Sequence, residues 1–193
     1  SKIENIVTNS NKAGHVGIAN LFGSNNQIKN SVSSLYYINM LVFSNFNTTI
    51  KDNIVHSGAI GMALSLNDSF IVHNSVNKNI MVGLSIFSGY NNNLENNSII
   101  DNYGYGGYGL ALGNTQYNNL TNNEIVRNTY GIYISNSDNN QLINNRLTQN
   151  GYGLFVESGL KNSFVGVNAK SNYYGVIFES ETSKNTLEQT YSC

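Results

Sequence analysis

Apolar residues recur along this chain in short pairs at a fixed spacing. A glycine followed by apolar residues at the first and third positions returns every 22 residues, with a single step of 26 and one replacement of the glycine. The anchors of this phrase are Gly17, Asn39, Gly61, Gly83, Gly109, Gly131, Gly153 and Gly175. Apolar side chains two residues apart share one face of a strand. A repeat of this length predicts a solenoid, in which each repeat buries its apolar face against its neighbours.

Two further apolar columns complete the repeat. The first lies eleven residues after the anchor and contains Ile28, Ile50, Val72, Leu94, Leu120, Leu142 and Phe164, with Leu187 displaced by one and Ile6 in an incomplete first coil. The second lies sixteen residues after the anchor and contains Val55, Ile99, Ile125, Leu147 and Ala169. No segment has the three- and four-residue spacing of an amphipathic helix. The pattern therefore predicts an all-β, three-sided parallel coil of about eight turns, forming one domain over residues 1–193.

Asparagines mark the predicted turns. One column, nine residues after the anchor, contains Asn26, Asn92, Asn118, Asn140 and Asn162, and another, thirteen after it, contains Asn30, Asp52, Asn74, Asn96, Asn122 and Asn144. Asparagine tolerates left-handed turn conformations, and stacked amides bond one another from rung to rung. We expect a structural role for these columns rather than ligand binding.

The combination of Gly-Ile-x-Ile, Asn-x-Leu and Asn-Asn-x-Leu in each turn, clearest over Gly131–Asn150, resembles the right-handed parallel β-helix repeat proteins. The resemblance is to the NosD-like and carbohydrate-binding or sugar-hydrolase group, and it extends from about Ile6 to Leu187. It implies a right-handed single-stranded β-helix. It does not fix an activity, because such proteins include polysaccharide lyases, hydrolases, epimerases, adhesins, phage tailspikes and surface proteins.

Composition narrows the classes of partner and compartment. The net charge is −1, only 11% of residues are charged and no basic stripe occurs, which argues against nucleic acid as a partner. No apolar run is long enough to span a bilayer. The single cysteine, Cys193, cannot form an internal disulfide, and we interpret it as an unpaired end. Few charges and four glycosylation sequons, at Asn47, Asn67, Asn96 and Asn119, favour an extracellular or cell-surface protein. Asn47 and Asn67 are the better acceptors, because the other two lie in or beside the asparagine columns.

The two ends of the predicted coil expose strand edges, which β-proteins usually cover. No amphipathic capping helix precedes Ile6, and the polar segment from Glu181 to Cys193 could lie over the last coil. An uncovered first coil suggests a fragment of a longer β-helix, or an end that meets another chain by end-to-end or lateral self-association.

The step of 26 places four extra residues near Tyr103–Tyr108, which includes Tyr105. Insertions in solenoids project as loops, often on the binding face, and aromatic rings pack on sugar rings. Asp101 and Arg127 occupy equivalent places in adjacent coils and could pair or hold a polar ligand. The alternative is a plain surface loop with a weak exposed ion pair.

A tyrosine column precedes the later anchors at Tyr108, Tyr130, Tyr152 and Tyr174, where the earlier coils have Val16, Ile38, Ile60 and Val82. We interpret it first as a partly buried aromatic stack. The competing interpretation is a sugar-binding strip continued by Tyr133 and Phe155, with Ile177 extending it as a contact for another chain.

Glu157 and Glu179 fall at the same place in adjacent coils, which predicts two stacked carboxylates that could bind calcium or act as an acid–base pair. A solvated pair is the favoured interpretation. The motifs of pectate lyases, polygalacturonases and mannuronan epimerases are missing, which argues against an enzyme. Met40 and Met62 belong to an inward column, and His15, His56 and His73 fall at different places in the turn, so no metal site or cofactor is predicted.

These observations favour a non-catalytic, extracellular structural or adhesive β-helix module, with polysaccharide or neighbouring surface proteins as partners. The alternative is a carbohydrate-binding or polysaccharide-processing domain. A ligand would then contact Tyr103, Tyr105, Tyr108, Asp101, Arg127 and Tyr130.

Overall fold

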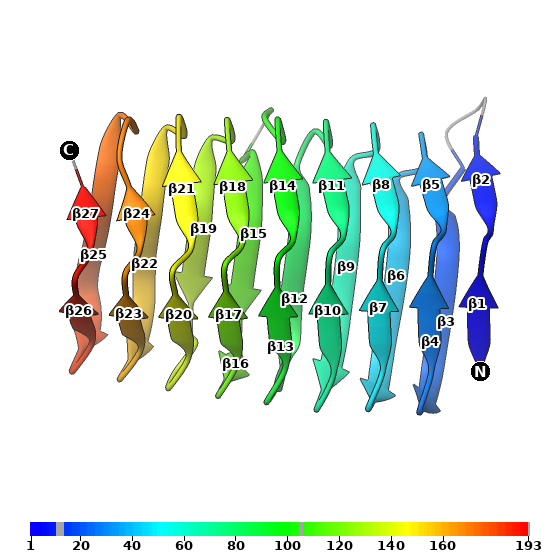
Figure 1. Ribbon diagram of the computed structural model, residues 1–193, viewed down its shortest axis with the longest axis horizontal. Coiled ribbons are helices and arrows are strands. Elements are labelled where there is room, and N and C mark those ends of the chain that lie inside the picture. The colour runs from blue at the N-terminus through cyan, green and yellow to red at the C-terminus, as the bar shows by residue number, and fades with distance from the viewer. Residues whose placement is uncertain (11–13, 105, 193) are drawn as a thin grey trace.

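The strands stack into three parallel sheets around one core, as the computed structural model shows (Figure 1). The structure describes residues 1–10, 14–104 and 106–192. We call the three sheets A, B and C, for the sheets that contain β1, β2 and β3, respectively. Sheets A and B form the near side of the stack in Figure 1, and sheet C lies behind them. Each coil contributes one strand to each sheet in turn, so the predicted three-sided parallel β-helix of about eight coils is confirmed.

The strand bounds follow the three predicted columns. Sheet A contains β1 (Lys2–Glu4), β4 (Gln27–Lys29), β7 (Thr49–Lys51), β10 (Phe70–Val72), β13 (Asn93–Glu95), β17 (Asn119–Thr121), β20 (Gln141–Ile143), β23 (Ser163–Val165) and β26 (Thr186–Glu188). Sheet B contains β2 (Val7–Asn9), β5 (Val32–Ser34), β8 (Ile54–His56), β11 (Ser75–Asn77), β14 (Ser98–Ile100), β18 (Glu124–Val126), β21 (Arg146–Thr148), β24 (Asn168–Ala169) and β27 (Tyr191–Ser192). Sheet C contains β3 (Val16–Ser24), β6 (Ile38–Phe46), β9 (Ile60–Asn67), β12 (Val82–Tyr90), β15 (Tyr108–Gly113), β19 (Tyr130–Ser135), β22 (Tyr152–Leu160) and β25 (Tyr174–Ser183), with β16 (Thr115–Gln116) paired to β12.

The core is built from the inward side chain of each short strand and the two inward side chains that follow each anchor. Almost all of these residues are completely buried. Two residues of the column predicted eleven residues after the anchor, Val72 and Ile6, do not point into the core, because the strand register differs from the strict period. Ile71 pairs with Ile50 and is buried, whereas Val72 is only half-buried. Ile3 pairs with Ile28, whereas Ile6 is 42% exposed.

Both errors come from irregular coils. Strand β9 has one residue fewer than β6 and β12, with a register irregularity after Leu64, so the next inward residue arrives one position early. The first coil has a longer connection between β2 and β3, so its inward residue in sheet A lies earlier than a strict period places it.

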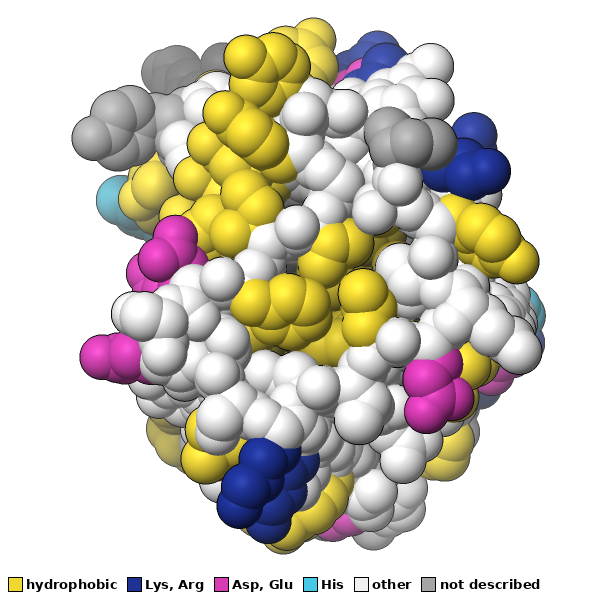
Figure 2. All heavy atoms as spheres, turned by 90° about the vertical axis from the view of Figure 1, so that its left-hand side faces the viewer, with side chains coloured by type: hydrophobic (Ala, Val, Ile, Leu, Met, Phe, Trp, Pro, Cys, Tyr) yellow, Lys and Arg dark blue, Asp and Glu magenta, His cyan; other side chains and the backbone are white. Residues whose placement is uncertain are grey.

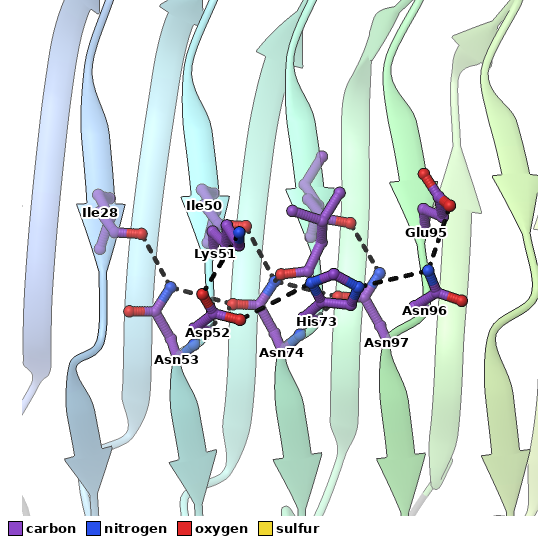
Figure 3. A network of polar contacts seen from close by, with 12 residues as sticks. Ile28, Ile50, Lys51, Asp52, Asn53, His73, Asn74, Glu95, Asn96 and Asn97 are labelled. Carbon is purple, nitrogen blue, oxygen red and sulfur yellow. Dashed lines mark hydrogen bonds and ion pairs between the residues drawn. The ribbon is translucent and has the colours of Figure 1, made fainter.

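Buried asparagines form ladders along the corners of the coil. One ladder, at the corner between sheets A and B, contains Asn53, Asn74 and Asn97 (Figure 3). The side-chain Nδ2 of each donates both to the Oδ1 of the asparagine one coil later and to a backbone oxygen one coil earlier. Asn123 and Asn145 continue this ladder. The backbone N–H of each rung also donates to the next Oδ1, so the side chains satisfy buried main-chain groups.

The predicted column of Asn30, Asp52, Asn74 and Asn96 is therefore divided. Asn74 belongs to the buried ladder, and the outer position in its coil is taken by His73. Asn30, Asp52, His73 and Asn96 are solvent-facing turn residues with φ values between 49° and 56°. The predicted structural role of the asparagines is confirmed for the buried ladders, and the outer column serves the left-handed turns.

The anchor glycines make room for another asparagine ladder. At the corner between sheets B and C, Asn79, Asn102, Asn128, Asn150 and Asn172 are hydrogen-bonded in series. A Cβ added at Gly83 would lie 2.7 Å from Asn102 Nδ2, and one added at Gly109 would lie 2.8 Å from Asn128 Nδ2. Only glycine therefore fits beside the ladder amide. In one coil the two residue types are exchanged: Asn39 takes the anchor position, Gly58 takes the ladder position, and Asn39 Nδ2 reaches Asn79 Oδ1 at 3.1 Å.

The C-terminal segment extends the stack instead of covering it. Strand β25 runs to Ser183 and β26 and β27 pair with β23 and β24, so the prediction that Glu181–Cys193 lies over the last coil is wrong for the described residues. Figure 2 shows apolar side chains at the centre of this end of the molecule. Phe178 and Leu187 are 38% and 47% exposed. Within the described ranges, no helix is long and apolar enough to cross a membrane.

Candidate functional site

The outer surface of sheet C carries a column of stacked tyrosines. Tyr108, Tyr130, Tyr152 and Tyr174 pair in register at the start of β15, β19, β22 and β25. Successive ring centroids lie 5.1, 4.7 and 4.9 Å apart, with interplanar angles of 29° or less. This spacing matches the ~4.8 Å rise between strands, so the backbone register alone brings the rings into contact. The predicted aromatic stack is confirmed.

A second aromatic column packs edge-on against the first. Tyr133 and Phe155 pair across β19 and β22, and their rings are nearly parallel, with centroids 5.9 Å apart. Phe155 meets Tyr130 and Tyr152 at interplanar angles close to 90°. We call the six side chains Tyr108, Tyr130, Tyr133, Tyr152, Phe155 and Tyr174 the aromatic face.

The stacking decides which atoms the tyrosine column can offer to a ligand. Both ring faces of Tyr130 and Tyr152 are covered by neighbouring rings, so their free edge is the phenol edge. In the described part of the chain, the phenol oxygens of Tyr108, Tyr130, Tyr152 and Tyr174 have no hydrogen-bond partner, although Tyr108, Tyr130 and Tyr152 are half-buried. The column therefore presents a row of hydroxyl groups at the strand spacing, each able to donate and accept.

A carboxylate borders the aromatic face. Ser135 Oγ donates to Glu157 Oε2 at 2.6 Å, and the Tyr133 hydroxyl lies near enough to this carboxylate to influence its pKa. Both groups favour the charged form, so the Ser135 and Tyr133 hydroxyls hold the pKa of Glu157 below its usual value. Burial, followed by the nearby Glu157 carboxylate, raises the pKa of Tyr133. Burial also raises the pKa of Tyr130. The phenols of Tyr130 and Tyr133 are thus neutral and Glu157 is ionised at neutral pH.

The predicted stacking of Glu157 with Glu179 falls at an irregularity in the pairing of β22 with β25, and it stays a prediction. Val156 pairs with Phe178 and Ser158 pairs with Glu181, with the irregularity between them, so Glu179 lies in a bulge. The polar contacts of Glu157 run to the preceding coil, and Glu179 is exposed. The carboxylates are therefore held in different surroundings.

The predicted insertion lies at the corner between sheets B and C, next to the tyrosine column. Tyr103 is 65% exposed, and the Gly107 carbonyl accepts from the N–H groups of Thr129 and Tyr130 at 3.0 and 3.2 Å. Tyr105 lies outside the described residues. The loop is thus tied through Gly107 to the strand that carries Tyr130.

Asp101 and Arg127 pair, as one of the two predictions for them has it. Arg127 Nε donates to Asp101 Oδ1 at 2.6 Å, and its terminal nitrogen donates to Oδ2 at 3.0 Å. The guanidinium lowers the pKa of Asp101, and the carboxylate raises the pKa of Arg127. Both groups are satisfied by each other, which leaves the pair as a brace between adjacent coils.

The glycosylation sequons differ in accessibility, and Asn96 is more exposed than its predicted place in an asparagine column suggested. Asn47 and Asn96 are exposed, and Asn67 and Asn119 are half-buried. Asn96 lies outside the buried ladder, with its Nδ2 3.1 Å from Glu95 Oε1, so its side chain is accessible (Figure 3). Glycosylation of all four stays a prediction.

A hollow on the corner between sheets C and A was not predicted. It has a volume of about 500 Å³ and is lined by Asn67, Ser88, Gly89, Tyr90, Asn114, Gln116 and Tyr117. Tyr117 also borders a second hollow of about 430 Å³ with Asp68, Phe70 and Asn93. Tyr90 and Tyr117 follow no column in the repeat, so the periodic pattern did not single them out.

Metal-binding residue types are scattered. Met40 and Met62 are fully buried in the core. His73 lies on the outer turn column, 3.8 Å from Asp52 (Figure 3). Among residues 1–10, 14–104 and 106–192, no group of three or more His, Cys, Asp or Glu is placed to hold a metal ion.

Comparison with solved structures gives polysaccharide-processing β-helices among the neighbours. The periplasmic alginate epimerase AlgG is 19% identical, with a TM-score of 0.84 over 92% of this chain and 47% of its own. The A-module of the Azotobacter vinelandii mannuronan C-5 epimerase AlgE4 is 15% identical, with a TM-score of 0.69 over 88% and 56%. DFA-IIIase from Arthrobacter chlorophenolicus A6, without its lid, is 14% identical, with a TM-score of 0.72 over 91% and 50%. At these identities the likeness shows the fold alone.

This chain spans about half the length of each of these neighbours. No curated protein matches it significantly. The family model described as "Periplasmic copper-binding protein (NosD)" matches residues 3–190, nearly the whole chain, and the resemblance of the repeat to NosD-like proteins is confirmed. The protein belongs to the NosD family of parallel β-helix proteins.

Proposed function

We propose that this chain is an extracytoplasmic carbohydrate-binding β-helix domain and that the aromatic face is its binding surface. The observation that carries the proposal is the row of unpaired phenol hydroxyls beside the edge-packed rings of Tyr133 and Phe155. Sugars offer apolar ring faces and many hydroxyl groups, and aromatic side chains with polar tips match both. A polymer lying along the axis over β15, β19, β22 and β25 would meet an equivalent phenol at each of these four strands.

Two comparisons support this proposal over a purely structural module. AlgG and AlgE4 are epimerases of polysaccharides and share the fold, although their low identity carries no activity to this chain. The family description and the AlgG name both contain the word periplasmic, which supports a location outside the cytoplasm. That the protein is exposed at the cell surface is a more specific proposal about its location.

Binding rather than catalysis is proposed because the acidic groups near the face are already engaged. Asp101 is neutralised by the two bonds from Arg127. Glu157 is held in its charged form by Ser135 and Tyr133, so it is a poor proton donor at neutral pH.

The family description names copper, but the proposed function does not involve copper binding. Soft copper sites use clustered Met, Cys or His. Met40 and Met62 are inaccessible in the core, and the described residues bring no group of three or more His, Cys, Asp or Glu together. The donor set of the described chain does not fit the ion.

A structural or adhesive surface module is the second candidate. It is favoured by the apolar group of Phe22, Phe43 and Phe87 on the N-terminal half of sheet C, with Phe22 72% exposed. Such a patch suits contact with a neighbouring protein rather than a sugar hydroxyl array.

Affinity electrophoresis in gels containing soluble polysaccharides tests the proposal. The protein should be retarded by at least one polymer, and Tyr152→Ala, which opens the middle of the stack, should abolish the retardation. Phe70→Ala removes an exposed aromatic side chain from sheet A and serves as the matched control. Loss of binding in the control as well, or equal binding by Tyr152→Ala, would contradict the assignment of the aromatic face.

A further inference from the structure

Charge is distributed unevenly among the three sheets. The eight long strands of sheet C, from β3 to β25, contain no Lys, Arg or His. Their charged residues are Glu157, Glu179 and Glu181, all near the C-terminal end of the sheet. Lysine, arginine and histidine in strands occur in sheets A and B, for example Lys51 in β7 and Arg146 in β21.

The arginines of the C-terminal half are themselves engaged. Arg127 is held by two hydrogen bonds to Asp101, at 2.6 and 3.0 Å. Arg146 donates to Glu124 at 2.6 Å on sheet B. The Asp101 carboxylate offsets the charge of Arg127, and the Glu124 carboxylate offsets that of Arg146, so neither guanidinium adds net positive charge beside the aromatic face. Among the described residues, the strands that carry the aromatic face therefore offer phenol hydroxyls, ring edges and the Glu157 carboxylate, and contain no Lys, Arg or His.

We propose that the aromatic face selects an uncharged polysaccharide and discriminates against polyuronates. The inference rests on the proposed carbohydrate-binding function and deepens it. A polyuronate brings a carboxylate on every sugar, and along this face each would meet hydroxyls or Glu157 rather than a compensating charge. Like charges across an interface are repelled, and an unpaired carboxylate loses solvation on binding.

A neutral sugar fits the same groups better. Its hydroxyls can donate to the remaining acceptor sites of the Glu157 carboxylate and exchange hydrogen bonds with the phenols of Tyr130 and Tyr152, while its apolar face lies against Phe155. The AlgG and AlgE4 neighbours are by name an alginate and a mannuronan epimerase. The fold is therefore shared, but the charge of this face points to a different class of polymer.

The experiment compares neutral polysaccharides with polyuronates on the same protein sample. Soluble mannan, glucan, xylan and galactan form the neutral panel, and mannuronan and polygalacturonate form the acidic one. Mannan and mannuronan are the most informative pair, because both are built from mannose units that differ in the carboxylate at C6. Dissociation constants are measured at low and at physiological ionic strength.

We expect at least one neutral polymer to bind at least about tenfold more tightly than any polyuronate, with an affinity that changes little with salt. Tyr152→Ala should remove this binding and Phe70→Ala should retain it. Equal or tighter binding of a polyuronate would overturn the selectivity while leaving the carbohydrate function standing. Binding to none of the six polymers would overturn the carbohydrate function and the selectivity with it.

Discussion

The substitution Asn123→Ala tests the central claim about the fold, namely that the amide ladders hold the coils together. Asn123 is fully buried in the middle of the ladder between sheets A and B. Its Oδ1 accepts from the backbone N–H and the Nδ2 of Asn97, at 3.0 and 2.9 Å. Its Nδ2 donates to the carbonyl oxygen of Leu94 at 2.9 Å and to Asn145 Oδ1 at 3.0 Å. Alanine removes these four bonds and retains the backbone donor of residue 123.

The expected loss follows from the groups left without partners. Each net hydrogen bond contributes about 1 kcal/mol, so the four bonds together give about 4 kcal/mol. Among the described residues, the backbone N–H of Asn97 has no other partner, and leaving it unpaired would alone cost about 1–3 kcal/mol. For a domain of this size, such a loss lowers the melting temperature by roughly 10 °C.

Urea and thermal unfolding followed by circular dichroism measure this loss. The matched control is Asn122→Gly, because Asn122 is the exposed neighbour with a φ of 55° and glycine accepts that conformation. We expect the control to change the free energy of unfolding by less than about 0.5 kcal/mol. A loss below about 1 kcal/mol in Asn123→Ala would refute the reasoning, since the ladder would then be incidental to stability.

Two further predictions concern the anchor glycines and the acidic border of the aromatic face. Gly109→Ala should lower the free energy of unfolding by about 2 kcal/mol or more, because the new Cβ would lie 2.8 Å from Asn128 Nδ2, whereas Gly113→Ala should be nearly neutral because nothing lies within 4 Å; similar melting temperatures for both variants would contradict this. The folded-state pKa of Glu157 is lowered, so its stabilising contribution is present above the ordinary carboxyl pKa and is lost as the pH falls through the lowered value. Unfolding curves from neutral pH to pH 3 should therefore show a weaker acid dependence for Glu157→Gln than for the original protein, and parallel curves would count against the role assigned to Ser135.

The architecture could be predicted from the sequence because inward side chains in a stacked coil are nearly all apolar. Strand alternation and a constant coil length were enough to place most of the core, including Leu94, Leu120 and Leu142. The prediction failed at Val72, where the total coil length is conserved but one residue is missing after Leu64 and is regained before Val82. A compensated shift of this kind leaves the period intact, so counting from the anchor cannot reveal it.

The reason for the glycine period could not be predicted, because it depends on a contact between successive coils at the corner between sheets B and C. Gly83 lies next to Asn102, which is 19 residues away in the sequence. Asn102 belongs to the asparagine ladder between sheets B and C, which was not recognised from the sequence. The exchange of Asn39 and Gly58 gives the one sequence signal that could have linked the two columns. The hollow beside Tyr117 was missed for the opposite reason, since it interrupts the repeat instead of following it.

The same separation explains where function can vary in this fold. Inward residues and ladder amides are constrained by burial and hydrogen bonding in every coil, whereas the outward aromatic residues on sheet C pack against other outward side chains of the same and adjacent coils. The freedom of outward positions to vary is visible at the position before the anchor, which changes from Val82 to Tyr108 between two adjacent coils without disturbing the register. The change coincides with the inserted loop and precedes the arrival of Tyr133, Phe155 and Glu157 in the following coils. Aromatic rings and a carboxylate are not needed to close the coil, because the N-terminal coils close with Val16 and Ile38 at the same position. The fold therefore does not require these aromatic rings and this carboxylate to gather on one outer face. A ligand that binds there would require it.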